Sequence, residues 1–157
     1  LLIEKGVSLA AAESCTGGEL EARITDIPGA SAVLRGGVVV YTNDAKHLLL
    51  GIPRDTLEKY GAVSREVAAE LAERVRLKLG ADLGVGVTGL AGPDGDGRNS
   101  VGTVFVSLSD GKRTWVREKH ITDRDRKTVR LYACQNVFDM LRRYLAGLPV
   151  EQKRADI

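Results

Sequence analysis

Apolar residues along this chain fall into short uncharged runs that are separated by segments with helical spacing. Runs of this length, bounded by Gly, Pro or Asp, are typical of strands that are covered on both faces. The three clearest runs are 7–12, 37–41 and 82–88. Residues 103–108 and 113–121 predict two further strands, because they flank Asp110-Gly111, a dipeptide typical of a tight hairpin.

Helices are predicted between these strands, and several have a recognisable first or last residue. Gly6 is suited to end a short helical segment over 1–5. Asn43 can cap a helix that runs to Leu50, and Ser64 can cap the long helix that ends at Gly80. The other helices are expected from the turn at 13–18 to about Asp26, for one turn from Pro53, and from near Asp123 to just before Gly147.

Strands that alternate with helices, followed by a hairpin and a last helix, predict an α/β fold. We expect three layers, α/β/α, around a mixed, mostly parallel sheet with a C-terminal hairpin and helix. The length of 157 residues fits one domain. We expect this domain to span 1–149 and the tail 150–157 to be disordered, because the tail has no apolar pattern.

Composition and charge narrow the function classes. Hydrophobic residues make up 43% of the chain, and no run approaches the length of a membrane-spanning helix. Net charge is +2 and only 4% of residues are aromatic, whereas nucleic-acid binders are commonly more basic or richer in stacking rings. We therefore expect a cytoplasmic protein with no membrane partner, and nucleic acid is an unlikely ligand.

Metal and disulfide chemistry find little support in the sequence. Cys15 and Cys134 cannot form a disulfide framework, and with His47 and His120 they offer no recognisable zinc motif. We expect free thiols, no metal and no cofactor, as in a protein of a reducing compartment. A signal-peptide cleavage pattern is also missing from the first residues.

One glycine motif resembles a dinucleotide-binding fingerprint. Gly84-Val-Gly86-Val-Thr-Gly89 has the G-x-G-x-x-G spacing. That fingerprint needs glycines that follow a strand and open a helix. Here the glycines lie inside the predicted strand 82–88 and precede the glycine-rich loop 89–100. Nucleotide binding of the Rossmann kind is therefore not expected.

The run Glu13-Ser14-Cys15-Thr16-Gly17-Gly18 is predicted to turn the chain sharply from strand to helix. A serine on such a turn can present its hydroxyl as a nucleophile. The N–H groups of the new helix can then hold an oxyanion or a phosphate. Ser and Thr are also favoured as plain helix caps, so both interpretations stay open at this point.

Cys15 is a rival nucleophile on chemical grounds, because a helix N-terminus lowers the pKa of a thiol. Adjacent side chains on a sharp turn point in different directions, so only one of Ser14 and Cys15 can face a cleft. We expect Cys15 to be buried as a small apolar residue.

Tyr41 and Lys46 are expected near the same sheet edge as Ser14. Tyr41 ends a predicted strand, and Lys46 lies in the first turn of the next helix. The carboxyl ends of parallel strands are where α/β proteins form their sites. Burial and the helix dipole both disfavour a charge on Lys46, and a neutral lysine can serve as the base for a serine. A solvated surface lysine is the alternative.

Two arginines extend the apolar stripe of the last helix. Arg126 and Arg130 are four residues apart, and the stripe continues through Ala133, Val137, Leu141 and Tyr144. Arginines on this face need an anionic partner. A phosphate is one candidate, because two guanidinium groups can hold it, and an internal Asp or Glu is the other.

Taken together, these runs resemble the CinA C-terminal domain family, whose stand-alone members include the nicotinamide-nucleotide amidase PncC. The resemblance covers about Leu1 to Leu145. The runs that carry it are 12–18, Gly36-Gly37 with Tyr41 and Lys46, 61–64, 87–93 and 101–104.

The resemblance implies a bacterial cytosolic amidase that converts nicotinamide mononucleotide to nicotinate mononucleotide and ammonia, without metal or cofactor. It implies Ser14 as nucleophile, Lys46 as its base and Tyr41 beside them. Residues expected to bind the substrate or the oxyanion are Thr16, Gly17, Gly18, Thr88, Gly89, Gly92, Arg126 and Arg130. We also expect a homo-oligomer, a dimer or larger. The alternative is a catalytically weak domain that binds a nucleotide or a partner in competence or DNA damage.

Overall fold

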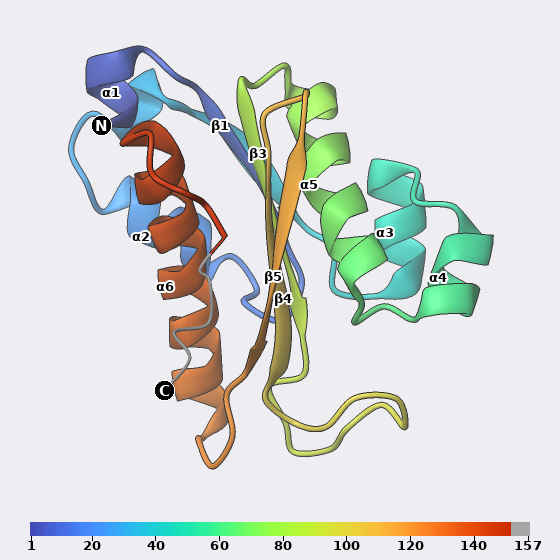
Figure 1. Ribbon diagram of the computed structural model, residues 1–157. Coiled ribbons are helices and arrows are strands. Elements are labelled where there is room, and N and C mark those ends of the chain that lie inside the picture. The colour runs from blue at the N-terminus through green and yellow to red at the C-terminus, as the bar shows by residue number, and fades with distance from the viewer. Residues whose placement is uncertain (152–157) are drawn as a thin grey trace.

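The computed structural model describes residues 1–151 and forms three layers. A five-stranded sheet with the order β2-β1-β3-β4-β5 lies between two layers of helices (Figure 1). The strands are β1 (Leu9–Glu13), β2 (Leu34–Val39), β3 (Leu83–Gly89), β4 (Thr103–Ser109) and β5 (Thr114–His120). Apart from Val150 and Glu151, the tail that we expect to be disordered lies outside the described residues.

The sheet is mixed, as predicted. Strand β1 pairs in parallel with both β2 and β3, whereas β4 pairs antiparallel with both β3 and β5. Strand β4 is therefore the one strand of the described sheet that runs against the others. The α/β class and the C-terminal hairpin and helix are confirmed.

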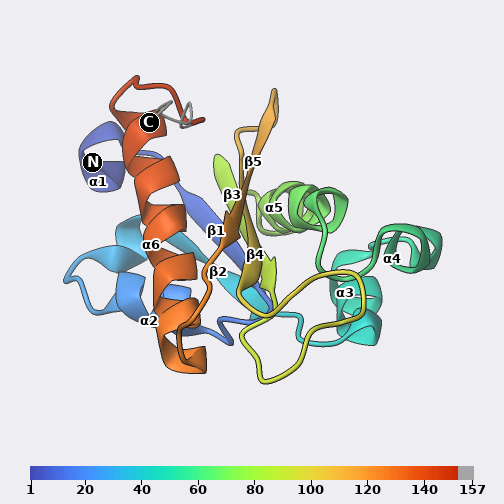
Figure 2. The ribbon, with the colours of Figure 1, turned by 60° about the horizontal axis from the view of Figure 1, so that its bottom comes forward.

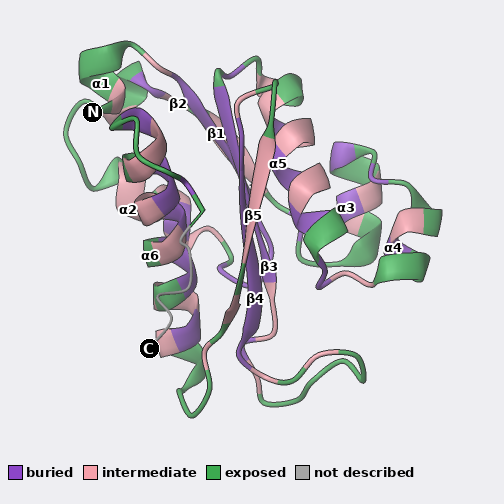
Figure 3. Ribbon diagram, viewed as in Figure 1, coloured by how far each residue is buried: buried purple, intermediate pink, exposed green. Residues whose placement is uncertain are grey.

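Helices cover both faces of the sheet (Figure 2). The described helices are α1 (Leu2–Lys5), α2 (Glu19–Thr25), η1 (Ala30–Ala32), α3 (Asn43–Leu50), α4 (Arg54–Tyr60), α5 (Arg65–Leu79) and α6 (Arg126–Leu145). Helices α1, α2 and α6 lie on one face, and α3, α4 and α5 lie on the other. The three central strands are almost entirely buried, whereas the edge strand β5 is half-buried (Figure 3).

Several boundaries differ from the sequence prediction. Strand β2 ends at Val39, so Tyr41 lies two residues beyond it rather than ending it. Thr42, and not Asn43, caps α3, because its side chain accepts a hydrogen bond from the Ala45 N–H at 3.1 Å. Side-chain capping decides where a helix begins, and two neighbouring polar residues are hard to separate by sequence alone. The cap at Ser64 is confirmed.

The central strand β1 sends alternate side chains to the two helical layers. Leu9 and Ala11 pack toward α2 and α6, and Ala10 and Ala12 pack toward α3 and α5. The chain leaves β1 through α2 on one face and returns to its other side through α5 on the opposite face. The carboxyl end of β1 is therefore the point where the strand order reverses, which is where ligands bind in sheets of this kind.

The glycines of the apparent dinucleotide fingerprint have a packing role. Gly84 and Gly86 lie inside β3, where α5 crosses the sheet. A Cβ at Gly86 would lie 2.6 Å from Ser107 Oγ and 2.8 Å from the Ala68 carbonyl oxygen. A Cβ at Gly84 would collide with the carbonyl of Ala72. The glycines thus let helix and strand backbones approach closely, and no helix opens after them.

We predict that Gly84→Ala and Gly86→Ala each lower the free energy of unfolding by about 1–3 kcal/mol, because both overpack the contact between α5 and β3. The loss should be larger at Gly84, since a Cβ there would collide more severely with the α5 backbone, at Ala72, than a Cβ at Gly86 would at Ala68. Urea unfolding followed by circular dichroism measures both values. An unchanged stability in either variant would contradict this account of the motif.

Candidate active site

A cleft of about 260 Å³ opens at the carboxyl edge of the sheet. Of the residues expected in a site, those that line it are Ser14, Tyr41, Lys46, Thr88, Gly89, Gly92 and Arg126. The other lining residues are Cys15, Ala62, Val63, Leu90, Ala91, Asp94 and Asp96. The expected residues Thr16, Gly17, Gly18 and Arg130 are not among them. Residues from five separate stretches of the chain thus meet at the predicted place.

The floor of the cleft holds a buried contact between Ser14 and Lys46. Lys46 Nζ donates to Ser14 Oγ at 3.1 Å and to the carbonyl oxygen of Val40 at 2.9 Å. Ser14 has 6% of its surface exposed and Lys46 has 1%. The main chain holds Ser14 in place, since its N–H donates to the Val87 carbonyl at 3.0 Å. The serine hydroxyl and the amine are therefore in hydrogen-bond contact and shielded from water.

Burial changes the protonation of Lys46. It lowers the pKa of the amine from 10.5 to about 8, because the charged form loses its hydration. The described structure places no carboxylate in hydrogen-bond contact with the amine, whose partners are a hydroxyl and a carbonyl. The sequence-based expectation of a buried lysine whose charge is disfavoured is confirmed, and the surface alternative is wrong.

Cys15 points away from the base. Its side chain belongs to the apolar cluster with Leu9 and Ala11, on the face of the sheet opposite Lys46. Burial raises the pKa of its thiol to about 12. A thiol in this state is a poor nucleophile at neutral pH. The expectation that Cys15 is buried is confirmed.

The rim of the cleft is formed by exposed polar contacts. Arg126, the first residue of α6, donates to the hydroxyl of Tyr41 at 2.6 Å and to the Gly92 carbonyl at 2.7 Å. Tyr41 has 55% of its surface exposed, and Arg126 is exposed as well. These contacts join three segments around the mouth of the cleft.

Arg130 has an internal partner instead. It donates to the Thr16 carbonyl at 2.7 Å and forms an ion pair with Glu19 at 3.5 Å. Of the two open interpretations of the arginine pair, the internal carboxylate therefore applies to Arg130. The stripe that continues from it is buried as predicted at Ala133, Val137 and Leu141.

The turn after β1 is fixed by a carboxylate that the sequence analysis missed. Glu13 is fully buried and accepts the N–H groups of Gly18 at 3.0 Å, Leu20 at 3.1 Å and Glu21 at 2.9 Å. It replaces the cap that Gly18 cannot supply, since Gly18 is the N-cap of α2 and has no side chain. The sequence does contain a hint of this role, because a Glu precedes a Gly-Gly pair at the predicted helix start and the glycines cannot cap the helix with a side chain.

This arrangement corrects the expectation for Gly17 and Gly18. The N–H of Gly17 donates to the Ser14 carbonyl at 3.1 Å, and that of Gly18 donates to Glu13. Neither group is free for a substrate oxygen. Thr16 is also fully buried, and its hydroxyl finds no partner within residues 1–151.

The loop after β3 closes the remaining side. Thr88 donates from its hydroxyl to the Ala62 carbonyl at 2.7 Å, which ties β3 to the segment before α5. Asn99 donates to the Val63 carbonyl at 2.9 Å, and Arg98 donates to the Lys59 carbonyl at 3.0 Å. These bonds bring Asp94 and Asp96 into the lining of the cleft, a position that the sequence did not reveal.

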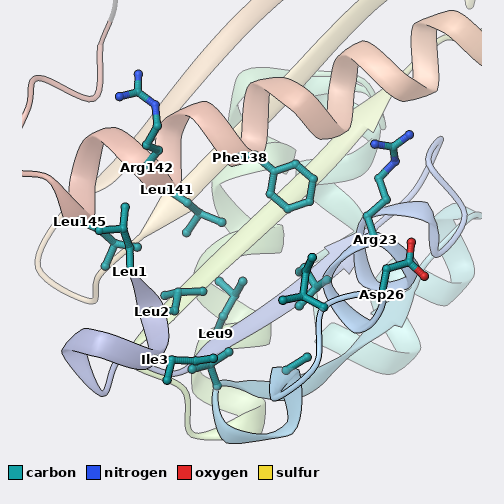
Figure 4. Close-up of a pocket in the computed structure, with 14 residues that line it drawn as sticks. Leu1, Leu2, Ile3, Leu9, Arg23, Asp26, Phe138, Leu141, Arg142 and Leu145 are labelled. Atoms are coloured by element: carbon teal, nitrogen blue, oxygen red, sulfur yellow. The ribbon is translucent and has the colours of Figure 1, made fainter.

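A larger cavity of about 580 Å³ lies elsewhere, between α1, α2, η1 and α6 (Figure 4). Its lining is mostly aliphatic and includes Leu2, Leu9 and Leu141, with Arg23 and Asp26 among its few charged residues. Neither Ser14 nor Lys46 lines it. The groups that can carry acid–base or nucleophilic chemistry are in the smaller cleft.

Within residues 1–151, no group of three or more His, Cys, Asp or Glu side chains is arranged to hold a metal ion. No helix in the same range is both long and apolar enough to cross a bilayer.

Comparisons with known proteins point to one family. A sequence model of the CinA C-terminal domain matches residues 1–145. A CinA-like protein of Desulfovibrio desulfuricans is 50% identical over 152 residues, which is 95% of this chain and 36% of that protein. A protein of Caldanaerobacter subterraneus described as a putative competence-damage inducible protein is 46% identical over 96% of this chain and 37% of its own. The chain thus spans little more than a third of these curated relatives.

Solved structures agree with this result. The competence damage-inducible protein A of Klebsiella pneumoniae superposes with a TM-score of 0.89 at 32% identity, over 92% of this chain and 90% of that one. The competence/damage inducible protein of Agrobacterium tumefaciens has a TM-score of 0.86 at 37% identity, over 89% and 86% of the two chains.

We predict a pH-dependent difference in stability between the protein and its Lys46→Met variant. An amine with a pKa of about 8 when folded and 10.5 when unfolded binds fewer protons in the folded state. The unchanged protein therefore gains stability over the variant as the pH rises from about 8 to about 10.5. The gain should approach about 3 kcal/mol, at about 1.4 kcal/mol for each pKa unit.

Urea unfolding of both proteins at pH 7, 8.5 and 10 measures this gain. Methionine is similar in length and does not titrate, so other ionisable groups cancel in the difference. A difference that stays constant across this range would show that the amine is not desolvated.

Proposed function

The chain belongs to the CinA C-terminal domain family, and we propose that it is an amidohydrolase that converts nicotinamide mononucleotide to nicotinate mononucleotide and ammonia. The observation that carries this proposal is the buried contact of 3.1 Å between Lys46 Nζ and Ser14 Oγ on the cleft floor. A serine beside an amine of lowered pKa is a known arrangement for acyl transfer. The identity of the proposed substrate comes from the resemblance of the sequence motifs to nicotinamide-nucleotide amidases.

The first half of the reaction forms an acyl-enzyme. Lys46 in its neutral form takes the proton of Ser14 Oγ, and the oxygen attacks the carboxamide carbon of the substrate. The tetrahedral intermediate collapses when Lys46 returns the proton to the nitrogen, which leaves as ammonia. The positive charge of the pyridinium ring withdraws electrons from the carbonyl and so favours the attack.

The second half hydrolyses the ester. Lys46, neutral again, takes a proton from a water molecule whose oxygen attacks the acyl carbon. The bond to Ser14 Oγ breaks, Ser14 regains its proton and nicotinate mononucleotide leaves. An amine with a pKa of about 8 suits this role, because it can accept and return a proton near neutral pH.

The oxyanion needs N–H donors from the turn. At a strand-to-helix turn that carries a nucleophile, the usual donor is the N–H of the next residue, which here is Cys15. This N–H donates to no main-chain carbonyl within residues 1–151. We assign the oxyanion contact to Cys15 rather than to Gly17 or Gly18, whose N–H groups are engaged in the turn.

The phosphate of the substrate is assigned to Arg126. Its guanidinium group lies at the mouth of the cleft, and its present partners are a neutral hydroxyl and a carbonyl. Arg130 already faces Glu19, which reduces its attraction for an anion. Gly89 and Gly92 line the same wall without side chains, which leaves room for a nucleotide between the loop and Arg126.

The proposal concerns the domain that this chain forms. It includes a cytoplasmic location, because Cys15 and Cys134 are free buried thiols, and assembly into a dimer or larger homo-oligomer. The competing function is a domain that binds a nucleotide or a partner without turnover. Release of ammonia from nicotinamide mononucleotide by the purified chain distinguishes the two.

We predict that Ser14→Ala and Lys46→Ala each reduce ammonia release to background and that the double variant is no worse than either. Residues that act as one catalytic unit are strongly non-additive. A coupled glutamate dehydrogenase assay measures ammonia directly. Cys15→Ala is the control and should keep most of its activity, because the thiol is buried and protonated. Losses that multiply in the double variant would show that Lys46 binds substrate independently of Ser14.

We also predict that Arg126→Ala weakens use of nicotinamide mononucleotide more than use of nicotinamide riboside, which lacks the phosphate. The loss in kcat/KM for the nucleotide should be about 10- to 150-fold, equivalent to about 1.5–3 kcal/mol for a charge-assisted contact. The matched control is Arg130→Ala, which should affect both substrates equally, since Arg130 serves the turn. Equal losses in Arg126→Ala would remove its phosphate role.

A further inference from the structure

A buried carboxylate lies directly behind the proposed nucleophile. Glu13 is the last residue of β1 and the neighbour of Ser14, and none of its surface is exposed. It accepts three main-chain N–H groups from the first turn of α2, at 2.9–3.1 Å. Since β1 alternates, Glu13 points toward α2 while Ser14 points toward Lys46 on the opposite face. The two residues therefore fix the same stretch of chain from opposite sides.

A second carboxyl group lies against the first. The Glu21 carboxyl of α2 is hydrogen-bonded to that of Glu13 and packs over Gly37 of β2, where a Cβ would collide with it. Burial and then the negative charge of Glu13 raise the pKa of Glu21 to about 7. Two carboxylates in contact repel each other, so a proton on Glu21 stabilises the pair.

The chain around Ser14 is held by three main-chain hydrogen bonds and by the Glu13 side chain. The Ser14 N–H binds the Val87 carbonyl of β3 at 3.0 Å, and the Glu13 carbonyl binds the Val40 N–H beyond β2 at 2.8 Å. The Ser14 carbonyl accepts the Gly17 N–H at 3.1 Å, and the Glu13 side chain anchors the start of α2. Of these anchors, Glu13 supplies the only side chain.

We propose that Glu13 is a positioning residue for Ser14, and that the Glu21 carboxyl group holds Glu13 in place. The carboxylate fixes the turn at 14–18 so that Ser14 Oγ meets Lys46 Nζ. The inference rests on the proposed function for what Ser14 does, but the pair of carboxyl groups is a property of the fold. A shift of about 1 Å in a reacting group can cost about 100-fold in rate, so a loosened turn should act on kcat.

Other titratable groups around the pair are accounted for. Helix α2 contributes Glu19, which pairs with Arg23 and with Arg130 of α6. Helix α6 also contributes Cys134, whose thiol is protonated because burial raises its pKa to about 12.

The first test compares Glu13→Gln with Asp82→Asn. Asp82 also binds a neighbouring main chain, through the Ser8 N–H at 2.8 Å, but at the opposite edge of the sheet. Both variants should melt at lower temperature. At a temperature where both are folded, only Glu13→Gln should lose about 10- to 100-fold in kcat with little change in KM, and react more slowly at Ser14 with a fluorophosphonate. Equal rates in the two variants would overturn the positioning role.

The second test uses Glu21→Gln, because glutamine can donate to Glu13 and cannot ionise. A carboxyl group with a raised pKa stabilises the folded protein below pH 4.5, and this contribution is lost as the pH rises through about 7. Glu21→Gln should therefore match the unchanged protein in melting temperature at pH 5 and exceed it at pH 8.5. If the difference in melting temperature between the two proteins is the same at pH 5 and pH 8.5, the role of Glu21 is overturned.

These readouts separate the inference from the proposed function. If the unchanged protein neither releases ammonia nor reacts at Ser14, the amidase proposal fails. Amide hydrogen exchange at Gly18, Leu20 and Glu21 then still tests the turn, because Glu13→Gln should speed exchange there by at least 10-fold while Asp82→Asn leaves it unchanged. Unaltered exchange in Glu13→Gln would overturn the inference, whether or not the protein is an amidase.

Discussion

The burial of one amine organises the carboxyl edge of this sheet. Lys46 has 1% of its surface exposed, and its Nζ has two oxygen partners, one a hydroxyl and the other a carbonyl. A charged amine without a carboxylate partner is costly at such a place, and the lowered pKa is the direct result. Keeping this amine beside a serine therefore lowers the stability of the fold, a cost that is common at functional sites. The alternation of side chains along β1 and the close packing of α5 on β3 both contribute to the burial of that amine.

Strand parity and backbone proximity bring the serine to the amine. Because β1 alternates, Ser14 points to the face that carries α3, while Glu13 and Cys15 face α2 and α6. Gly84 and Gly86 let α5 approach β3, which buries the same face along the neighbouring strand. A residue inserted in β1 before Glu13 would exchange the two faces for the residues that follow, so that the carboxylate would meet the amine. The order Glu-Ser-Cys is therefore dictated by geometry as much as by reactivity.

Features that depend on neighbouring residues are predictable from this sequence, whereas contacts between distant residues are not. The layers, the hairpin and the turn at Ser14 follow from local runs, whereas the burial of Lys46 was one of two interpretations that the sequence left open. The three N–H contacts of Glu13 were missed because a strand-end glutamate has no propensity signal for capping a later helix. The contact of Tyr41 with Arg126 spans 85 residues and that of Arg130 with Thr16 spans 114, so only the tertiary fold brings them together.

The floor and the rim of the cleft differ in how easily their contacts can be exchanged. On the floor, Ser14 and Lys46 are buried, and Glu13 is buried behind them. Breaking the hydrogen bonds of these residues would leave buried polar groups without a partner. On the rim, Arg126 and Tyr41 are exposed, and a hydrogen bond between such groups contributes only about 0.5–1.5 kcal/mol net. An incoming anion can therefore replace Tyr41 or Gly92 as the partner of Arg126 at small cost. A rigid floor and an exchangeable rim let a charged ligand enter without disturbing the geometry on which the proposed chemistry depends.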